Sequence, residues 1–406
     1  MADSWVSLLK NKTFVLVWLS GMTVMLGFSI FFLSVSWFVV DEMQQPAILG
    51  VVMMTIAIPR VAMMIYGGVL ADKIQKSRIM FTTNAMQVIV MVVLVVLVQQ
   101  DALQTTSLII LAFIFGFLDA FFFPAASAMI PSIVPVHQLQ QANSWYQGST
   151  ELMFIIGPVG AGLLLTFGGF SFAFSAAACL IALSTMLIYP PLLKDPVPEA
   201  RTGRHTAWMD LKEGLSYVRQ SGIHRSGTLV IITINLLMIG PLLISIPMLI
   251  SALGGAPWQL SLLEGGFSTG TFLLSVLLVT WSLKQRRGRW VLGALGAGFI
   301  LLFVFSQVEA LPVLVAVITL MGGAGMLVYL PTITMIQEKT DNNKLGRVMS
   351  LVNFAASGFE PIAFALISFL VAATIPIQTV LMYTSVTGIV LTGLLLWLSP
   401  EFRRTD

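Results

Sequence analysis

Apolar residues run along this chain in stretches long enough to cross a membrane. About 20 residues in a helix span the roughly 30 Å hydrocarbon core of a bilayer. Twelve such stretches are expected, at 14–40, 48–71, 79–98, 106–130, 144–167, 170–189, 227–251, 259–283, 290–307, 311–336, 348–372 and 377–398. The connections are short except between 189 and 227. The pattern therefore predicts an all-α membrane protein with twelve transmembrane helices in two halves of six.

Composition and charge agree with a membrane-embedded chain. Of its 406 residues, 57% are hydrophobic and 10% are charged, whereas about a quarter of a soluble domain is charged. With both termini in the cytoplasm, every Lys and Arg except Arg60 lies on the cytoplasmic side, as positively charged loops require. The net charge of +3 is then a signal of topology. No basic patch of the kind that binds nucleic acid is expected.

The long central segment divides the chain into two bundles. We predict an amino-terminal six-helix bundle at 1–190, a cytoplasmic linker at 191–226 and a carboxy-terminal six-helix bundle at 227–406. Within the linker, apolar residues recur at helical spacing at Trp208, Leu211, Leu215 and Val218. This spacing predicts a short amphipathic helix at the inner membrane surface. The alternative is a solvated linker without a fixed position.

The two halves also resemble each other. A shift of 206 residues aligns Met129, Ile130, Leu139 and Ser144 with Met335, Ile336, Leu345 and Ser350, and Gln147 with Asn353. Together with the six-plus-six pattern, this indicates two pseudo-symmetric bundles around a central cavity, with a binding site between them.

No cofactor or metal is expected. The chain has one cysteine, Cys179, for which we expect a packing role, and its histidines, His137, His205 and His224, are scattered. It lacks a phosphate-binding loop of the G-x-x-x-x-G-K-[ST] type, so ATP is not expected to drive it directly. A constellation of catalytic residues is also lacking, and we expect no enzyme.

Three motifs resemble those of a transporter family. The stretch GVLADKIQKSR, residues 68–78, resembles the signature of the major facilitator superfamily, although Gln75 replaces a glycine and Ser77 a basic residue. GPVGAG, residues 157–162, resembles part of the fifth-helix signature of drug:proton antiporters, with Met153 at an expected glycine. Residues 124–143 are similar to the exporter branch that contains macrolide-efflux and enterobactin-export proteins.

The resemblance implies a multi-pass protein of the plasma membrane, a bacterial inner membrane, acting as a monomer. Spans 1, 2, 4, 5, 7, 8, 10 and 11 would border the central cavity, and the other four would support it. A gating motif would comprise Gly68, Asp72, Lys73, Lys76, Arg78, Gly157 and Pro158. Asp72 would interact across the inner gate. The basic residues of this motif are equally well explained as ordinary cytoplasmic charges.

Five charged residues lie deep in the expected spans, all of them in spans assigned to the cavity: Arg60, Asp119, Glu151, Glu264 and Glu360. A charge at the bilayer centre costs about 2.5–3.5 kcal/mol on insertion scales. We therefore expect Arg60 to pair with Glu151, Asp119 or both. These three residues are candidates for proton coupling, with Glu151 first. The alternative is a fixed ion pair that only locks helix packing.

Polar and aromatic residues suggest how a cavity would be lined. Asn143, Gln147 and Glu151 form one stripe on span 5, and Ser350, Asn353, Ser357 and Glu360 form another on span 11. Further lining candidates are Glu264, Phe28, Phe31, Phe123 and Phe267. Such a surface suits lipophilic, drug-sized molecules. The alternatives are hydrogen bonding in a dry helix interface for the polar stripes, and packing or lipid contact for the aromatic rings.

These features predict a secondary active efflux transporter that exchanges protons for lipophilic compounds by alternating access. Its partners would be protons, the lipid bilayer and a small-molecule substrate, and its role would be multidrug efflux and antibiotic resistance. The alternatives are a proton-coupled uptake symporter, an exporter of a specific metabolite such as a siderophore, and a membrane enzyme or channel.

Overall fold

The computed structural model describes residues 8–71, 74–193, 195, 207–280, 285–341 and 344–405. All regular secondary structure in these residues is helical. They contain eleven helical segments that are long and apolar enough to cross a membrane. One of these, Val136–Leu187, holds two of the expected spans because the chain turns within it. The twelve-helix membrane fold predicted from the sequence is confirmed.

The turn inside the longest segment occurs at a glycine. Helix α6 (Leu139–Leu187) contains one residue outside helical geometry, Gly169, with φ 69° and ψ −173°. This left-handed φ is readily adopted only by glycine, which has no Cβ to clash with its own backbone. Spans 5 and 6 are therefore joined directly at Gly169.

Packing divides the described chain into two compact units, which we describe separately. One unit holds the residues within 1–38 and 55–203, and the other holds those within 39–54 and 204–406. The first part of α3 thus packs with the second unit. The predicted boundaries at 190 and 227 stay a prediction.

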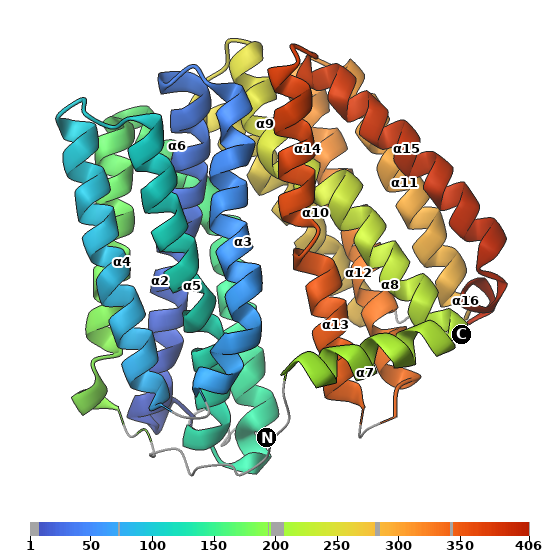
Figure 1. Ribbon diagram of the computed structural model, residues 1–406, viewed down its shortest axis with the longest axis horizontal. Helices are drawn as coiled ribbons and strands as arrows, with labels where there is room; N and C mark the ends of the chain where they lie inside the picture. The colour runs from blue at the N-terminus through green and yellow to red at the C-terminus, as the bar shows by residue number, and fades with distance from the viewer. Residues whose placement is uncertain are drawn as a thin grey trace. The chain divides into compact units, whose positions relative to one another are not determined.

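The first unit is built from long helices. They are α2 (Lys12–Trp37), most of α3 (Pro46–Ala71), α4 (Lys76–Gln99), α5 (Thr105–Ile133) and α6. Helices α2, α4, α5 and α6 run side by side (Figure 1). Small residues allow α2 and α6 to approach closely, since a Cβ on Gly157 would overlap the side chain of Ser29 and one on Gly21 would lie within 3.0 Å of the Tyr146 hydroxyl.

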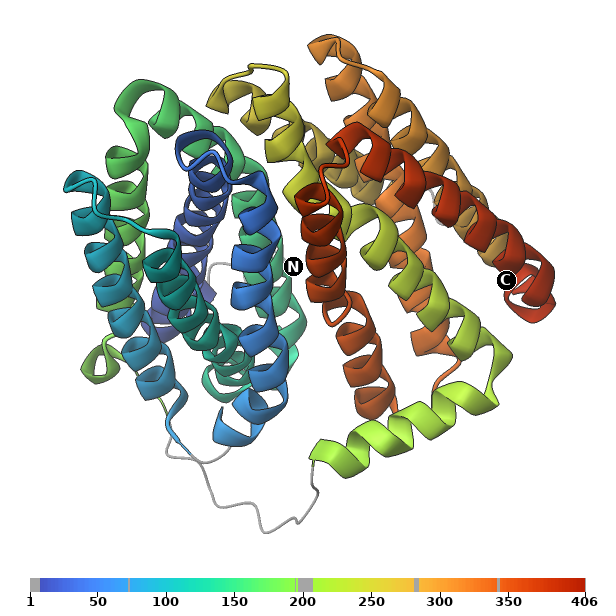
Figure 2. The same cartoon turned by 45° about the horizontal axis from the view of Figure 1, so that its top comes forward.

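The second unit contains shorter helices as well as long ones. Its helices are α7 (Ala207–Gln220), α8 (Gly222–Ile234), α9 (Gly240–Ala252), α10 (Pro257–Thr280), α11 (Arg287–Gln307), α12 (Leu311–Glu338), α13 (Leu345–Ser357), α14 (Glu360–Ala372), α15 (Ile377–Leu398) and α16 (Pro400–Arg404). Span 11 is divided into α13 and α14 by a turn at 358–359 (Figure 2). Span 7 runs without a gap from α8 to α9 through the π-helical segment Asn235–Ile239.

The π-helical segment of span 7 and the break of span 11 lie next to each other. In span 11, Pro361 has no N–H, so the carbonyl of Ser357 cannot receive its usual helical hydrogen bond. In span 7, the π-helical segment Asn235–Ile239 ends where the Gly240 N–H bonds to the carbonyl of Asn235. A Cβ on Gly240 would lie 2.7 Å from that of Ala363 in α14. The hydrophobic pattern showed both spans as single runs and predicted neither the π-helical segment nor the break.

Helix α7 is the helix expected in the linker, and it is packed on the second unit. Val218 belongs to a buried cluster with Ile336 of α12 and three residues of α13, namely Val348, Leu351 and Val352. His224, at the start of α8, contacts Ser221 and Thr340 through its two ring nitrogens, at 2.7 and 2.8 Å. Figures 1 and 2 show α7 crossing the end of α13. A linker without a fixed position does not describe this segment.

One expectation about packing is wrong. Cys179, expected to pack inside its span, is exposed on α6. The neighbours Ala177 and Ala178 are buried instead, because only one face of this helix turns toward the unit's interior. Hydrophobicity does not distinguish the two faces when both are apolar.

The sequence repeat has a structural counterpart. Helices α6 and α13 start at Leu139 and Leu345, in the register that the sequence shift of 206 predicted. The aligned pairs at Met129 and Met335, and at Ile130 and Ile336, are buried in both units. The shared register places equivalent side chains in equivalent environments.

Candidate functional site

The site in the first unit begins where α3 and α5 cross. A Cβ on Gly116 of α5 would lie 2.7 Å from the Cα of Ile56 on α3, so the two backbones touch. Arg60 and Asp119 follow one helical turn further along their helices. There, Nε of Arg60 lies 3.4 Å from Oδ2 of Asp119. Glycine at the crossing therefore brings the two charged side chains together.

The two partners differ in exposure. The side chain of Asp119 is 2% exposed, whereas that of Arg60 is 50% exposed. Oδ1 of Asp119 is buried and has no hydrogen-bond partner in the described part of the chain. Buried carboxylates normally satisfy both oxygens, so Arg60 is the main compensation for this charge.

The second unit repeats the crossing without the charges. A Cβ on Gly322 of α12 would lie 3.2 Å from the Cα of Phe267 on α10. One turn further along stand Thr271 and Gly325, where the first unit has Arg60 and Asp119. The Thr271 hydroxyl donates to the carbonyls of Phe267 and Gly322, at 3.1 and 3.2 Å. Of these two equivalent crossings, the one in the first unit carries an ion pair and the one in the second unit carries neutral residues.

Glu151, the other carboxylate expected near Arg60, lies elsewhere. It is exposed on α6 together with Asn143 and Gln147. Among the ion pairs of the described residues, Arg60 is joined to Asp119 and not to Glu151. Lipid is a poor solvent for a carboxylate and two amides on one helix face. The exposure of these three polar side chains on one helix face is therefore what a water-facing surface requires.

The aromatic candidates of the first unit are mostly packed. Phe28 and Phe31 are 1% and 2% exposed, and their rings lie 5.2 and 4.1 Å from the ring of Phe115. Phe123 is half-buried, with its ring 6.3 Å from Phe28. Phe28 and Phe31 thus belong to the interior of the unit here, and their role as cavity-lining residues stays a prediction.

The candidates of the second unit are spread over two helix systems. Asn353 is exposed on α13, while Ser357 and Glu360 are half-buried on either side of the break in span 11. Glu264 and Phe267 are half-buried on α10. A Cβ on Gly240, at the end of the π-helical segment of span 7, would lie 3.8 Å from the Cα of Glu360, a proximity that sequence spacing did not reveal.

The structure describes some residues of the expected gating motif and not others. Asp72 and Lys73 lie outside the described residues, and Gly68 lies in α3. Lys76 and Arg78 are in the first turn of α4. Of the fifth-helix motif, Gly157 packs on α2 and Pro158 lies within α6.

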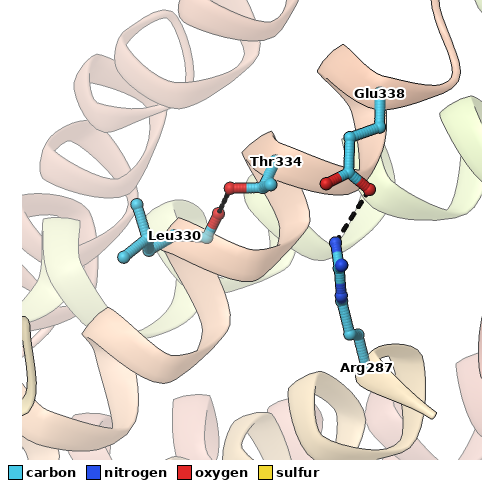
Figure 3. A network of polar contacts seen from close by, with 4 residues as sticks. All are labelled: Arg287, Leu330, Thr334 and Glu338. Carbon is cyan, nitrogen blue, oxygen red and sulfur yellow. Dashed lines mark hydrogen bonds and ion pairs between the residues drawn. The ribbon is translucent and has the colours of Figure 1, made fainter. Parts of the chain in front are cut away.

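Three polar contacts near these elements were not predicted. Asp195 accepts hydrogen bonds from the backbone and hydroxyl of Ser77, each 2.8 Å, and so caps α4. Arg287 at the start of α11 pairs with Glu338 at the end of α12, at 2.8 Å (Figure 3). In the interior, Asn84 donates to Ser184 at 2.9 Å. The sequence could have indicated the Asn84 contact, because an amide inside an apolar span needs a hydrogen-bond partner.

The geometry defines a polytopic helical membrane protein with a charged pair inside one of two repeated units. The chain matches the family model of the Major Facilitator Superfamily over residues 17–359 and belongs to this family. Family members are transporters.

The curated relatives include one named as a transporter and others named for efflux or export. The staphyloferrin A transporter of Staphylococcus aureus is 27% identical over 221 residues, which cover 54% of this chain and 54% of the relative. Macrolide efflux protein A of Enterococcus faecalis is 26% identical, covering 73% and 92%. The enterobactin exporter EntS of Salmonella typhimurium is 25% identical, covering 83% and 80%. The chain spans about half the length of the first of these relatives.

Solved structures share the fold. A mutant of the nucleoside transporter NupG matches with a TM-score of 0.75 at 11% identity, covering 95% of this chain and 99% of that one. A structure from work on proton-dependent oligopeptide transporters matches with a TM-score of 0.70 at 14% identity, covering 97% and 99%. At these identities the likeness shows the fold alone.

Proposed function

We propose that this chain is a proton-coupled efflux transporter for lipophilic small molecules, working by alternating access. The observation that carries the proposal is the Arg60–Asp119 pair. It places a carboxylate that is 2% exposed against an arginine that is 50% exposed. Movement of α3 against α5 would separate the charges, and Asp119 would then be stabler with a proton bound.

The pair also favours Asp119 over Glu151 as the coupling residue. Glu151 is exposed at the end of the polar stripe formed with Asn143 and Gln147, an arrangement that suits contact with substrate and water. We therefore assign Asp119 and Arg60 to coupling, and Asn143, Gln147 and Glu151 to the substrate pathway. Export as the direction of transport is supported by the names of macrolide efflux protein A and the enterobactin exporter.

The test uses the purified full-length chain in proteoliposomes with an imposed proton gradient. A panel of dyes and macrolide antibiotics is offered to wild type, Asp119→Asn and Glu151→Gln. We expect Asp119→Asn to bind substrate and exchange it, but to lose accumulation driven by the gradient. Glu151→Gln should keep coupling and change which substrates are carried. Glu309→Gln, in an expected outer loop, is the control for loss of one carboxylate.

The outcomes separate the alternatives. Gradient-driven accumulation by Asp119→Asn at the wild-type rate and pH dependence would reject Asp119 as the coupling group. Loss of coupling in Glu151→Gln alone would restore the order predicted from the sequence. Substrate movement in the same direction as protons would identify an uptake symporter.

A second candidate substrate is a specific metabolite such as a siderophore. It is favoured by the relatives named for staphyloferrin A and enterobactin. Adding purified siderophores to the same panel decides between them: transport of one siderophore, with no movement of dyes or macrolides, would replace the multidrug assignment.

A further inference from the structure

A groove of about 480 Å³ lies on the surface of the first unit, between α4 and α6. It is lined by Phe81, Ala85 and Val88 of α4 and by Ala182, Thr185 and Met186 of α6, and it ends at Tyr189 and Leu192. Its volume lies in the range of about 300–1,000 Å³ that is typical of ligand sites. The groove belongs to spans 3 and 6, whereas the Arg60–Asp119 pair belongs to spans 2 and 4.

Its walls have the chemistry of a hydrocarbon site. The lining includes the small residues Ala85 and Ala182, and its side chains are apolar apart from two hydroxyls. That of Thr185 bonds to its own helix at the Ile181 carbonyl, and that of Tyr189 stands at the end of the groove. The rings of Phe81 and Tyr189 meet edge to face at 5.5 Å within this lining. Because both helices are membrane spans, the medium that reaches this groove is lipid, and an acyl chain matches its walls.

A positive charge stands at the end of the groove. Arg78 precedes Phe81 by three residues and Ala85 by seven, so the three residues share one face of α4. The Arg78 side chain is exposed and is in no ion pair within the described ranges. The nearby carboxylate of Asp195 is directed to the N–H and hydroxyl of Ser77.

The position of this charge suits an anionic lipid. Arg78 lies at the start of a span that we expect to begin at the cytoplasmic surface, where basic residues attract anionic headgroups. A guanidinium binds phosphate through two parallel hydrogen bonds, which an ammonium cannot do. Lys76, two residues earlier, adds a second positive charge to the same helix end.

We propose that this groove is a binding site for one anionic phospholipid, with an acyl chain between α4 and α6 and the phosphate on Arg78. The site is distinct from the substrate pathway and does not depend on what the protein exports.

The experiment is native mass spectrometry of the full-length chain in detergent, titrated with phosphatidylglycerol or with phosphatidylcholine of the same acyl chains. We expect one tight adduct with phosphatidylglycerol. Arg78→Gln should weaken this adduct by about five- to tenfold. It should weaken phosphatidylcholine binding less, because the positive choline offsets the phosphate charge in that lipid. Ala182→Trp fills the groove and should weaken both lipids.

Matched variants separate a defined site from general lipid contact. Lys12→Gln removes one exposed positive charge from the start of α2, and Met86→Trp adds the same indole to α4 on a side chain that is 52% exposed and outside the lining. Neither should change binding. Val88→Trp serves as a second filling variant if Ala182→Trp does not fold, and Arg78→Gln, at an exposed position, tests the headgroup independently.

Three results would overturn the proposal. The first is equal retention of both lipids by wild type. The second is undiminished phosphatidylglycerol binding in Arg78→Gln or in a folded filling variant. The third is a loss in Lys12→Gln or Met86→Trp as large as in the groove variants, which would indicate only general contact with surrounding lipid.

Discussion

Nε of Arg60 lies 3.4 Å from Oδ2 of Asp119, and the contact is one-sided: the carboxylate side chain is 2% exposed and the guanidinium side chain 50% exposed. Half of the arginine side chain is accessible from outside the protein, whereas the acid is enclosed by it. The two residues are therefore not equivalent members of an ion pair, and their removal has different consequences.

We predict that Arg60→Ala destabilises the protein more than Asp119→Asn. Without Arg60, a buried carboxylate loses its compensating charge, at a cost on the order of 3 kcal/mol. Without the Asp119 charge, half of the Arg60 side chain is still exposed and free to reorient, and the expected loss is smaller, about 1 kcal/mol or less. The measurement is the free energy of unfolding in mixed detergent micelles. The double variant should recover part of the Arg60→Ala loss, and a double variant as unstable as the sum of both would contradict this explanation.

The close approach of α3 and α5 gives a second prediction. Gly116→Ala should lower stability by about 1–3 kcal/mol, because its Cβ meets the backbone of Ile56, which cannot move aside like a flexible side chain. It should also disturb the Arg60–Asp119 contact and reduce transport. Gly160→Ala in α6 is the matched control, since no atom lies within 4 Å of its added Cβ. Ordinarily alanine is the better helix former, so equal stability of the two variants would argue against the crossing.

Helix α7 offers a test in which sequence pattern and structure disagree. Leu215 and Val218 belong to the same predicted apolar face, yet Leu215 is 36% exposed and Val218 is 4% exposed. Val218→Asn should increase hydrogen exchange of α7 amides by on the order of tenfold, because it places an amide in an apolar cluster. Leu215→Asn should change exchange little. Equal protection of α7 in both variants would mean that the cluster around Val218 does not hold the helix.

The Arg287–Glu338 pair is expected to contribute little to stability, although its 2.8 Å contact is shorter than that of Arg60 and Asp119 (Figure 3). The Glu338 side chain is 46% exposed, and exposed pairs contribute about 0–1 kcal/mol. Glu338→Gln should therefore shift the thermal unfolding midpoint slightly, and less so in 1 M salt, where the Debye length is about 3 Å. Thr334→Val is the control, because it removes only a hydroxyl bonded to the Leu330 carbonyl of its own helix. A large loss in Glu338→Gln that salt does not reduce would refute the prediction.

Much of the fold was predictable because it depends on local properties. The length of an apolar run decides whether a helix can cross the bilayer, and this placed all twelve spans. Helical spacing within 191–226 was enough to predict α7, which the structure gives as Ala207–Gln220. The signature at 68–78 identified the family that the match over residues 17–359 shows.

The site was predictable only as a set of alternatives. Sequence reasoning recognised that Arg60 needed a carboxylate partner, since an isolated charge in a membrane is costly. It could not choose between Asp119 and Glu151, because depth along a helix is readable from sequence while rotation about the helix axis is not. The crossing at Gly116 made that choice.

By itself, then, the sequence determined the family, the number of spans and which deep charges required compensation, all of which follow from hydrophobic length, motif and the cost of burying charge. Tertiary structure alone decided that Arg60 meets Asp119, that Phe28 and Phe31 pack on Phe115, that Cys179 faces outward, and that the π-helical segment of span 7 adjoins the break of span 11 at Gly240. The physical reason is common to all four. In a chain that is apolar on every face, polarity no longer marks which side of a helix turns inward, and only the fit between backbones and side chains does.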